Sequence, residues 1–468
     1  MATLKTNYKD DILNTAMNNK RRYTEEINPD GTKSFTDATQ YSQVGDQFGA
    51  SDINNTNTEV NRVADELLDA KNDITQISND LTAPAEQNTA FIFDYKNGSF
   101  GYNTDPSRGA DTFHPFSGFE GAGIFRYMNT PSVNWQRIGI NRDLEAVASV
   151  GTTAGHSDYD NVYPWSEMTR VTLSTGDVMV KIPKFYFRRY IDRDCEFIQI
   201  SQSKNTCPKD FQLHPAFNHG GVETDCIYVG AYKTTSSHYS KSGLAPLVSL
   251  TRAGFRNGAR AKGTGWSMID ISARSAITML YLVEFASNNA QANIGRGWCD
   301  GNSGALNTGS CDSVPNRTGR PSGTDGKTGV VYRGIEDFWG NIWEFVDGLN
   351  FNNGQYWVCN DITKYADDTT SNYTQLSYTG ATGWSTSYIS QEGLDSNNSH
   401  VFMPQIASGA GENTYYTDAV WSSTGWRVLL SGGSWSVGSA CGVFAANVHD
   451  ASSGSAASVG SRLLYIPS

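Results

Sequence analysis

The segment GIEDFWGNIWEFVDG, residues 334–348, combines large apolar side chains with acidic ones. Its large apolar residues have the spacing of side chains that pack together. They are Phe338, Trp339, Ile342, Trp343 and Phe345. Because aromatic side chains bury large areas and dominate the energetics of a core, the segment predicts a buried aromatic framework.

Four acidic residues surround this framework, namely Glu336, Asp337, Glu344 and Asp347. Glycoside hydrolysis needs two carboxylates, so a catalytic pair is one interpretation of these acids. The spacing of the aromatic residues favours the other interpretation, in which the rings are buried and the acids lie exposed around them. We therefore predict no catalytic residues here.

The C-terminal end has two strand-like segments, WRVLLSGGSWSVGSACGVF from residue 426 and GSRLLYIP from residue 460. Residues 433–460 contain no Lys, Glu, Gln or Met, and Trp435, Cys441 and Phe444 are their only large exceptions. Small polar residues cannot form a core, but they suit an exposed surface held by strands on either side. The residue types present, Trp435 excepted, are also those reached from an asparagine codon by changing adenines alone. An ordinary small-residue loop remains the alternative.

Upstream of this end, the sequence predicts one clear helix and a β-rich stretch. In WSMIDISARSAITMLYLVEFAS, residues 266–287, Ile277, Leu280 and Tyr281 step at helical spacing, with Asp270 or Ser272 as the N-cap. From about residue 90 to 240, short aromatic segments such as FIFDY read as strands broken by Gly and Pro. In DVMVKIPKFYFRRY, the alternation of Val178, Val180 and Ile182 indicates a half-buried strand, which confines Pro183 to an edge or bulge.

Residues 51–84 carry a seven-residue apolar repeat. Its a positions are Ile53, Val60, Leu67, Ile74 and Leu81, and its d positions are Thr56, Val63, Ala70 and Ile77. A 3.5-residue period keeps one apolar stripe facing a partner helix, and β-branched residues at both positions favour three strands. We predict a trimeric coiled coil, with a lone amphipathic helix as the alternative.

Residues 1–50 are polar, and Pro29–Gly31 form a turn signal between two possible short strands. We predict an arm that becomes ordered on a partner, and a disordered leader is the alternative. The N-terminus has no apolar core typical of a signal peptide, and no run of about 18 apolar residues predicts a membrane span.

Composition narrows the class of protein. The 468 residues carry a net charge of −12 and no cluster of Lys and Arg, which argues against binding to nucleic acid. Seven scattered cysteines indicate reduced, mostly buried thiols. They are Cys195, Cys207, Cys226, Cys299, Cys311, Cys359 and Cys441. We expect no metal and no cofactor, and an α+β chain with a coiled coil at residues 51–84, a β-rich module at 90–240 and a C-terminal domain at 241–468.

Several segments resemble a known family. WRVLLSGGSW and GSRLLY resemble the closing strands of the C-type-lectin fold in formylglycine-generating-type proteins, and GIEDFWGNIWEFVDG resembles their Gly-Asn-x-Trp-Glu core. More narrowly, the arrangement resembles the variable proteins of diversity-generating retroelements, in which adenine mutagenesis varies a receptor-binding surface. YDNVYPWSEM (159–168) and VMVKIPKFYF (178–187) are similar to phage tail proteins, and LKTNYKDDIL (4–13) to the N-termini of phage structural proteins.

The resemblance implies roles for individual residues. The fixed scaffold would comprise Trp339, Asn341, Trp343, Glu344, Gly432, Gly433, Trp435, Gly442, Gly460 and Arg462. The variable residues, and hence the receptor contacts, would be Ser434, Ser436, Val437, Ser439, Ala440, Ala445, Ala446, Asn447, His449, Asp450, Ser452, Ser455, Ala457 and Ser458. The enzymes of the family hold copper with two cysteines in this region. Here Cys441 stands alone in the sequence, so oxidase activity is not expected.

The resemblance implies a receptor-binding adhesin at the tail tip of a phage virion, acting at the outer surface of a bacterial host. Its partners would be a cell-surface glycan or protein, other tail proteins and two further copies of the chain, with no membrane insertion. The alternatives are a structural tail or neck decoration protein and a tail enzyme that degrades surface polysaccharide.

Overall fold

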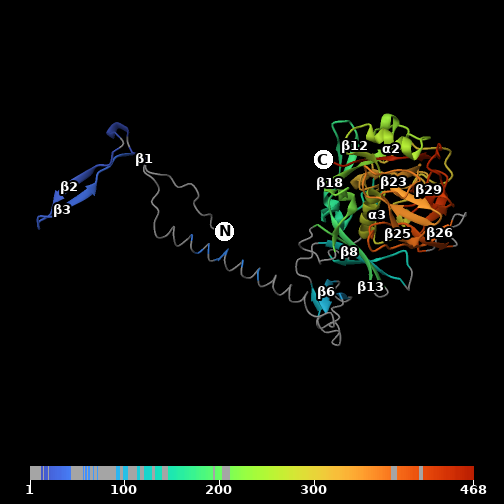
Figure 1. Ribbon diagram of the computed structural model, residues 1–468, viewed down its shortest axis with the longest axis horizontal. Helices are drawn as coiled ribbons and strands as arrows, with labels where there is room; N and C mark the ends of the chain where they lie inside the picture. Colours follow the sequence, from blue (N-terminus) through green and yellow to red (C-terminus); the bar gives the residue numbers. More distant parts are fainter. Residues whose placement is uncertain are drawn as a thin grey trace. The chain divides into compact units, whose positions relative to one another are not determined.

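In the computed structural model the chain is β-rich with few helices, and it divides into two compact units, Met1–Thr89 and Ala90–Ser468 (Figure 1). The structure describes parts of residues 12–43 and 56–71, then 91–94, 99–103 and 113–115. It describes residues 121–467 except 129–131, 140–145, 193–194, 203–210, 381–386 and 410–414. In the part of the chain so described, no helix is long and apolar enough to cross a membrane.

The first unit contains the hairpin predicted around Pro29–Gly31. Strands β2 (Tyr23–Ile27) and β3 (Lys33–Asp37) pair antiparallel, and β1 (Ile12–Leu13) pairs with β4 (Tyr41–Gln43). Gly31 has φ +83°, a left-handed conformation that a side chain disfavours and that closes the turn. The turn prediction is therefore confirmed.

The β2–β3 hairpin is amphipathic, and its apolar side chains are exposed among the described residues. Its register pairs Tyr23 with Asp37, Glu25 with Phe35 and Ile27 with Lys33. Alternate residues of a strand share a face, so every apolar residue of the hairpin lies on the same side. Tyr23, Ile27 and Phe35 are 55%, 72% and 63% exposed.

Within the predicted coiled coil, the described residues are helical. They are Thr56, Thr58, Val60, Arg62, Val63, Leu67 and Lys71. The apolar members Val60, Val63 and Leu67 are 59%, 51% and 70% exposed in the single chain. Ile53, Ile74, Ile77 and Leu81 lie outside the described residues.

In the described part of the second unit, the largest sheet has nine strands, in the order β25-β24-β23-β29-β30-β28-β26-β27, with β31 beside β23. The aromatic framework segment runs into its long central strand, β23 (Trp343–Asn352). The other strands are β24 (Gln355–Val358), β25 (Thr374–Thr379), β26 (Ser387–Glu392), β27 (Pro404–Gly409), β28 (Ala419–Ser422), β29 (Trp426–Ser431), β30 (Ala446–Val448) and β31 (Val459–Gly460).

A five-stranded sheet joins the middle of the chain to its end. Its order is β11 (Thr169–Thr172), β12 (Val178–Pro183), β18 (Cys226–Lys233), β32 (Arg462–Tyr465) and β19 (Trp266–Met268). Because β18 pairs directly with β32, the boundary expected between residues 240 and 241 does not separate two compact units.

Strand β12 also corrects one detail of the prediction. Pro183 ends the strand, where a missing N–H is tolerated, but the strand is more than half-buried. Met179 is fully buried as well as Val180 and Ile182, because both faces of this strand are covered.

The remaining strands form smaller sheets. A five-stranded sheet has the order β15 (Gln212–Leu213), β13 (Tyr186–Asp192), β14 (Cys195–Ser201), β8 (Gly121–Tyr127) and β9 (Gln136–Gly139). A four-stranded sheet contains β10 (Ser149–Val150), β20 (Gly319–Arg320), β21 (Val331–Tyr332) and β22 (Ile335–Glu336). Smaller still are β5 (Phe91–Asp94) with β6 (Ser99–Asn103) and β7 (Phe113–Pro115), and β16 (Asn218–His219) with β17 (Val222–Glu223).

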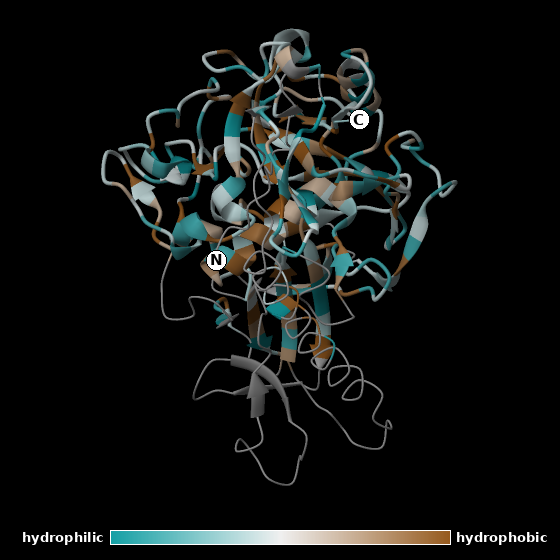
Figure 2. Cartoon of the chain, turned by 90° about the vertical axis from the view of Figure 1, so that its left-hand side faces the viewer, coloured by the Kyte–Doolittle hydropathy of each residue, from teal (hydrophilic) through white to brown (hydrophobic). Residues whose placement is uncertain are grey.

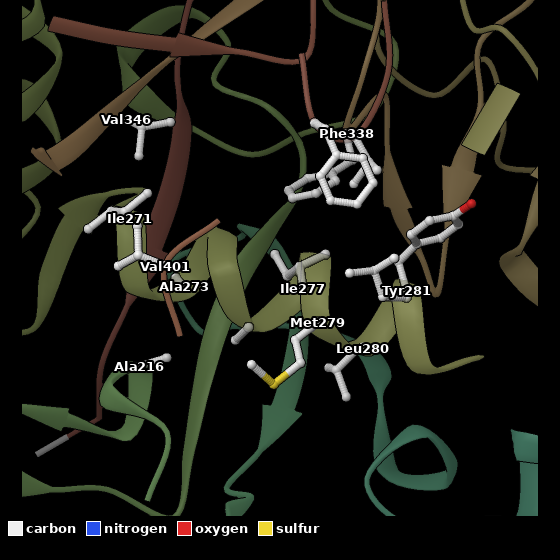
Figure 3. Close-up of a cluster of buried hydrophobic side chains, with 14 of the residues drawn as sticks. Ala216, Ile271, Ala273, Ile277, Met279, Leu280, Tyr281, Phe338, Val346 and Val401 are labelled. Carbon is white, nitrogen blue, oxygen red and sulfur yellow. The ribbon is translucent and has the colours of Figure 1, made fainter. Parts of the chain in front are cut away.

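The predicted helix is α3 (Ile271–Phe285), and the side chain of Asp270 caps it by accepting from the N–H of Ala273 at 2.8 Å. Every residue of α3 except Phe285 is buried, because the helix contacts β23 as well as β8 and β14. Figure 3 shows Phe338 and Val346 on one side of it and Ala216 on the other. Apolar segments gather towards the middle of the unit and polar ones in its outer loops (Figure 2). Two shorter helices, α2 (Arg252–Arg260) and α4 (Ala290–Asn293), flank it in sequence.

The aromatic framework is buried as predicted, but the prediction of exposed acids is wrong. Glu336, Asp337, Glu344 and Asp347 are each at most 1% exposed. Glu336 accepts from the backbone N–H groups of Gly309 and Cys311, and Asp347 binds the guanidinium of Arg256 at 2.6 Å. Backbone N–H groups and cations from segments far away in the sequence offset the cost of burying these carboxylates. The local sequence does not reveal those partners.

Glu344 lies at the centre of a buried ionic cluster. Its carboxylate contacts Arg462 of β32 at 2.7 Å, Lys233 of β18 at 3.0 Å and Arg274 of α3 at 3.9 Å. Burial alone would raise the pKa of Glu344, but the three cations hold it below its ordinary value. Burial also lowers the pKa of Lys233 to about 8, against the opposing attraction of Glu344. A single carboxylate thus joins three other segments of the unit.

Glu392, at the end of β26, is a second buried acid, but its pKa is raised whereas that of Glu344 is lowered. It is 3% exposed, and neither of its carboxylate oxygens has a hydrogen-bond partner among the described residues. Burial raises its pKa to about 8, although Arg189 and Arg126 oppose the shift. At neutral pH the folded chain therefore favours the protonated form of Glu392.

This environment predicts how stability depends on pH. Between about pH 4.5 and pH 8, folded Glu392 keeps a proton that the unfolded chain releases, so the free energy of unfolding falls as the pH rises. Glu392→Gln removes this titration and should flatten the fall between pH 5 and pH 8, measured by urea unfolding. Glu167→Gln, at a half-exposed acid, is the control. An unchanged slope in Glu392→Gln would contradict the assignment.

Candidate receptor-binding surface

Residues 433–460 begin at a turn that only glycine suits. Gly432 and Gly433 follow β29 with φ +90° and +88°. A Cβ on Gly433 would collide with the side chain of Cys441. The turn therefore sends the chain away from β29 while keeping its backbone against the core.

Trp435 and Asn341 lock the start of the segment to the framework. The N–H of Trp435 donates to the carbonyl of Asn341 at 2.9 Å, and its carbonyl accepts from the N–H of Asn302 at 3.0 Å. The buried Asn341 side chain binds both the N–H and the carbonyl of Leu306 and donates to Asp337. These bonds fix the backbone of Trp435, whose side chain is half-buried.

The other proposed scaffold residues lie beneath or at the end of the segment. Trp343 meets Trp421 edge to face at 5.3 Å between ring centroids, and Trp339 donates to the carbonyl of Gly295 at 3.0 Å. Gly460 passes so close to Ile342 that a Cβ would collide with it, and a Cβ on Gly442 would collide with Asp418. Arg462 completes the frame through Glu344.

The structure divides the fourteen candidate variable residues by accessibility. Four are buried and have no access to a receptor in this conformation: Ser434, Ala440, Ala445 and Ala446. Seven are half-buried: Val437, Ser439, Asn447, His449, Asp450, Ser452 and Ser458. Three are exposed: Ser436, Ser455 and Ala457. Ten candidates therefore remain accessible, and we call them the accessible set.

Bonds within the segment hold part of the accessible set in place. The side chain of Asn447 donates to Asp450 at 2.9 Å and accepts from the N–H of His449 at 2.8 Å. The carbonyl of Asp450 accepts from the N–H of Val428 in β29 at 3.1 Å. The turn after β30 is therefore tied to the large sheet by backbone as well as side-chain bonds.

Residues from other segments border the accessible set, and sequence reasoning missed three whose side chains or strand pairing lie next to it. The hydroxyl of Tyr388 lies 3.0 Å from that of Ser439, and Asp368 accepts from the hydroxyl of Ser452 at 2.6 Å. Trp421 is the register partner of Asn447 where β28 pairs with β30. No sequence signal links them to residues 433–460, because the contacts come from the pairing of distant strands.

Cys441 does not stand alone in the structure, contrary to the inference from sequence. The thiol of Cys299 lies beside it, and burial together with this neighbour raises the pKa of Cys441 well above its ordinary value. Both thiols are free and buried. Cys299 and Cys441 therefore form a pair of neighbouring thiols, although the described residues contain no group of three or more His, Cys, Asp or Glu that could hold a metal.

The accessible set offers mainly hydroxyl and methyl groups, with one amide, one imidazole and one carboxylate. Short side chains of this kind bind partners through adaptable hydrogen bonds, while neighbouring aromatic rings such as Trp421 supply rigid contact area. The arrangement is suited to non-covalent recognition. Comparison of the chain with models of protein families and with curated proteins found no match.

This division by accessibility predicts which positions accept large side chains. Ala457→Tyr, at an exposed position, should change the free energy of unfolding by less than about 0.5 kcal/mol. Ala445 is 1% exposed and lines a cavity of only about 20 Å³, with room for about one water molecule. Ala445→Tyr should therefore cost roughly 2 kcal/mol or more by overpacking. Equal urea midpoints for the two variants would show that Ala445 is not held in the core.

Proposed function

We propose that this chain is a receptor-binding adhesin of a phage tail tip, which recognises a bacterial surface through the accessible set. The observation that carries the proposal is the separation of roles within residues 433–460. Glycines, Trp435 and strand pairing hold the backbone, while ten mostly small side chains remain accessible on it. Side chains can change on such a surface without disturbing the core beneath.

The arrangement of the resembling segments supports a C-type-lectin-like domain within the second unit. The Gly-Asn-x-Trp-Glu segment leads into β23, which pairs antiparallel with β29 and parallel with β31. Glu344 of that segment binds Arg462 of the closing strand. The segments that suggested the family from sequence therefore meet at β23, two of them through this ion pair and the third through the pairing of β29.

The helical residues of the first unit support a homotrimer. Val60, Val63 and Leu67 occupy a and d positions, and each is more than half exposed in the single chain. Apolar residues at these spacings bury their side chains against partner helices, and β-branched ones favour three strands. Two further copies of this chain are the partners that the pattern fits.

The β2–β3 hairpin supports an attachment role for the N-terminal arm. A two-stranded hairpin is marginally stable by itself in water, and this one exposes Tyr23, Ile27 and Phe35 on one face. Burial of that face on another tail protein would stabilise both the hairpin and the attachment. In a trimer attached in this way, three weak contacts with the host surface can raise the avidity by roughly 10²–10⁴ over a single contact.

A cell-binding assay tests the proposal. Labelled full-length protein is titrated onto a panel of bacterial strains, and at least one strain should bind it saturably. Replacing the three exposed members of the accessible set, Ser436, Ser455 and Ala457, with Arg should abolish that binding, because the large cations block the surface. The control variant carries Arg at three exposed residues elsewhere in the second unit, Ser174, Asn257 and Thr264, and it should bind the strain as the parent chain does.

Three outcomes would count against the proposal. Binding to no strain favours a structural decoration protein, and release of sugar fragments from bound cells favours a polysaccharide-degrading enzyme. Equal loss in both triple variants would show that the accessible set is not the contact surface. A chain starting at Ala90 should bind the same strain with affinity lowered by roughly two orders of magnitude or more, because it lacks the trimerising region.

A further inference from the structure

A hollow of about 280 Å³ opens beside the five-stranded sheet that contains β11, β12 and β18. The proposed adhesion assigns no role to this region. Strands β11, β12 and β18 contribute Arg170, Thr172, Val178 and Tyr232 to its lining. A distant loop contributes Asp312 and Arg317. None of the lining residues belongs to residues 433–460, so the hollow is separate from the accessible set.

Arg170 is a buried side chain in the lining of this hollow, and one of its donor groups is unpaired among the described residues. Its side chain is 7% exposed and stacks on the ring of Tyr232, with the guanidinium carbon 4.8 Å from the ring centroid. Nε donates to the carbonyl of Gly334 at 2.7 Å, and Nη1 donates to Asp312 at 2.6 Å. Nη2 is buried and has no partner among the described residues. Leaving a charged donor unpaired is costly, and the positive charge of Arg170 is therefore compensated only in part by the groups that it contacts.

Asp312 compensates Arg170 only in part, because its oxygens also accept from two other groups. Oδ1 accepts from Arg170 and from the hydroxyl of Tyr232 at 2.5 Å, and Oδ2 accepts from Ser242 at 2.6 Å. Burial would raise the pKa of Asp312, but these hydrogen bonds hold it below its ordinary value. Asp312 thus orients Arg170 and stays ionised.

Arg317 adds a second guanidinium to the lining, and it is exposed. It has φ +52° and follows Asn316 at φ +54°, two consecutive left-handed residues that are not glycine. Such a conformation costs free energy and persists where the surrounding structure imposes it. Two guanidinium groups against one carboxylate leave the hollow with a net positive charge.

We propose that this hollow binds the carboxylate of an acidic monosaccharide, such as a uronic acid. Guanidinium groups bind carboxylates through charge-assisted, often bidentate hydrogen bonds, and here the exposed Arg317 is the donor, with the positive charge of Arg170 beside it. The hydroxyl of Thr172 can bond a sugar hydroxyl, and Val178 offers an apolar contact. The volume is close to the lower end of small-molecule sites, about 300 Å³, which fits one sugar unit. The site does not depend on the adhesin proposal.

Calorimetric titration of the full chain with glucuronate tests this site, with glucose as the neutral probe and inorganic phosphate as the simple anion. Glucuronate should bind, and glucose should not. Arg317→Asn keeps a residue that tolerates a left-handed backbone and should weaken glucuronate binding about tenfold or more. Arg317→Lys keeps the positive charge but lacks the planar guanidinium, so its affinity for glucuronate should lie between those of the parent chain and Arg317→Asn. Arg22→Asn, an exposed arginine of the first unit, is the matched control and should bind as the parent does.

Three results would overturn the proposal. The first is absence of glucuronate binding by the parent chain at millimolar concentration, and the second is equal affinities in Arg317→Asn and Arg22→Asn. Phosphate binding as tightly as glucuronate would overturn the sugar assignment, because the hollow would then recognise charge alone.

Discussion

The ionic cluster around Glu344 is the constraint on which the second unit depends. This buried carboxylate holds Arg462 of β32, Lys233 of β18 and Arg274 of α3 together. Burying one charge without partners would cost several kcal/mol, so the four side chains can enter the interior only as a set. The sheet, the central helix and the last strand must therefore assemble in one arrangement. Residues 433–460 begin and end on strands that this arrangement fixes.

The surface that we propose for receptor binding follows from this frame. Glycine turns, Asn341 and pairing to the large sheet hold most of the backbone of residues 433–460 without the accessible side chains, and the bonds of Asn447 to Asp450 and His449 act only in the turn after β30. Four of the fourteen residues suggested by the resemblance are instead part of the core. Composition alone could not separate the two groups, because Ala445 in the core and Ala457 on the surface are the same residue type.

Local patterns in the sequence predicted the local parts of the structure. The apolar spacing and Asp270 gave α3, Pro29–Gly31 gave the hairpin, and the aromatic spacing gave the buried framework. Contacts between distant segments were not predictable. The burial of Glu344, the Cys299 neighbour of Cys441, the sheet that crosses the boundary at residues 240 and 241, and the border formed by Tyr388 all arise from strands brought together by the fold.

Hydrogen–deuterium exchange on a chain with all ten accessible positions replaced tests the central claim, that the frame is independent of the side chains displayed on it. The replacements are drawn from the residue types already present in residues 433–460. Our account predicts that amides of β23, β29 and β32 keep the protection that they have in the parent chain. Loss of protection in these strands would show that the accessible side chains help to hold the frame, and would contradict the account.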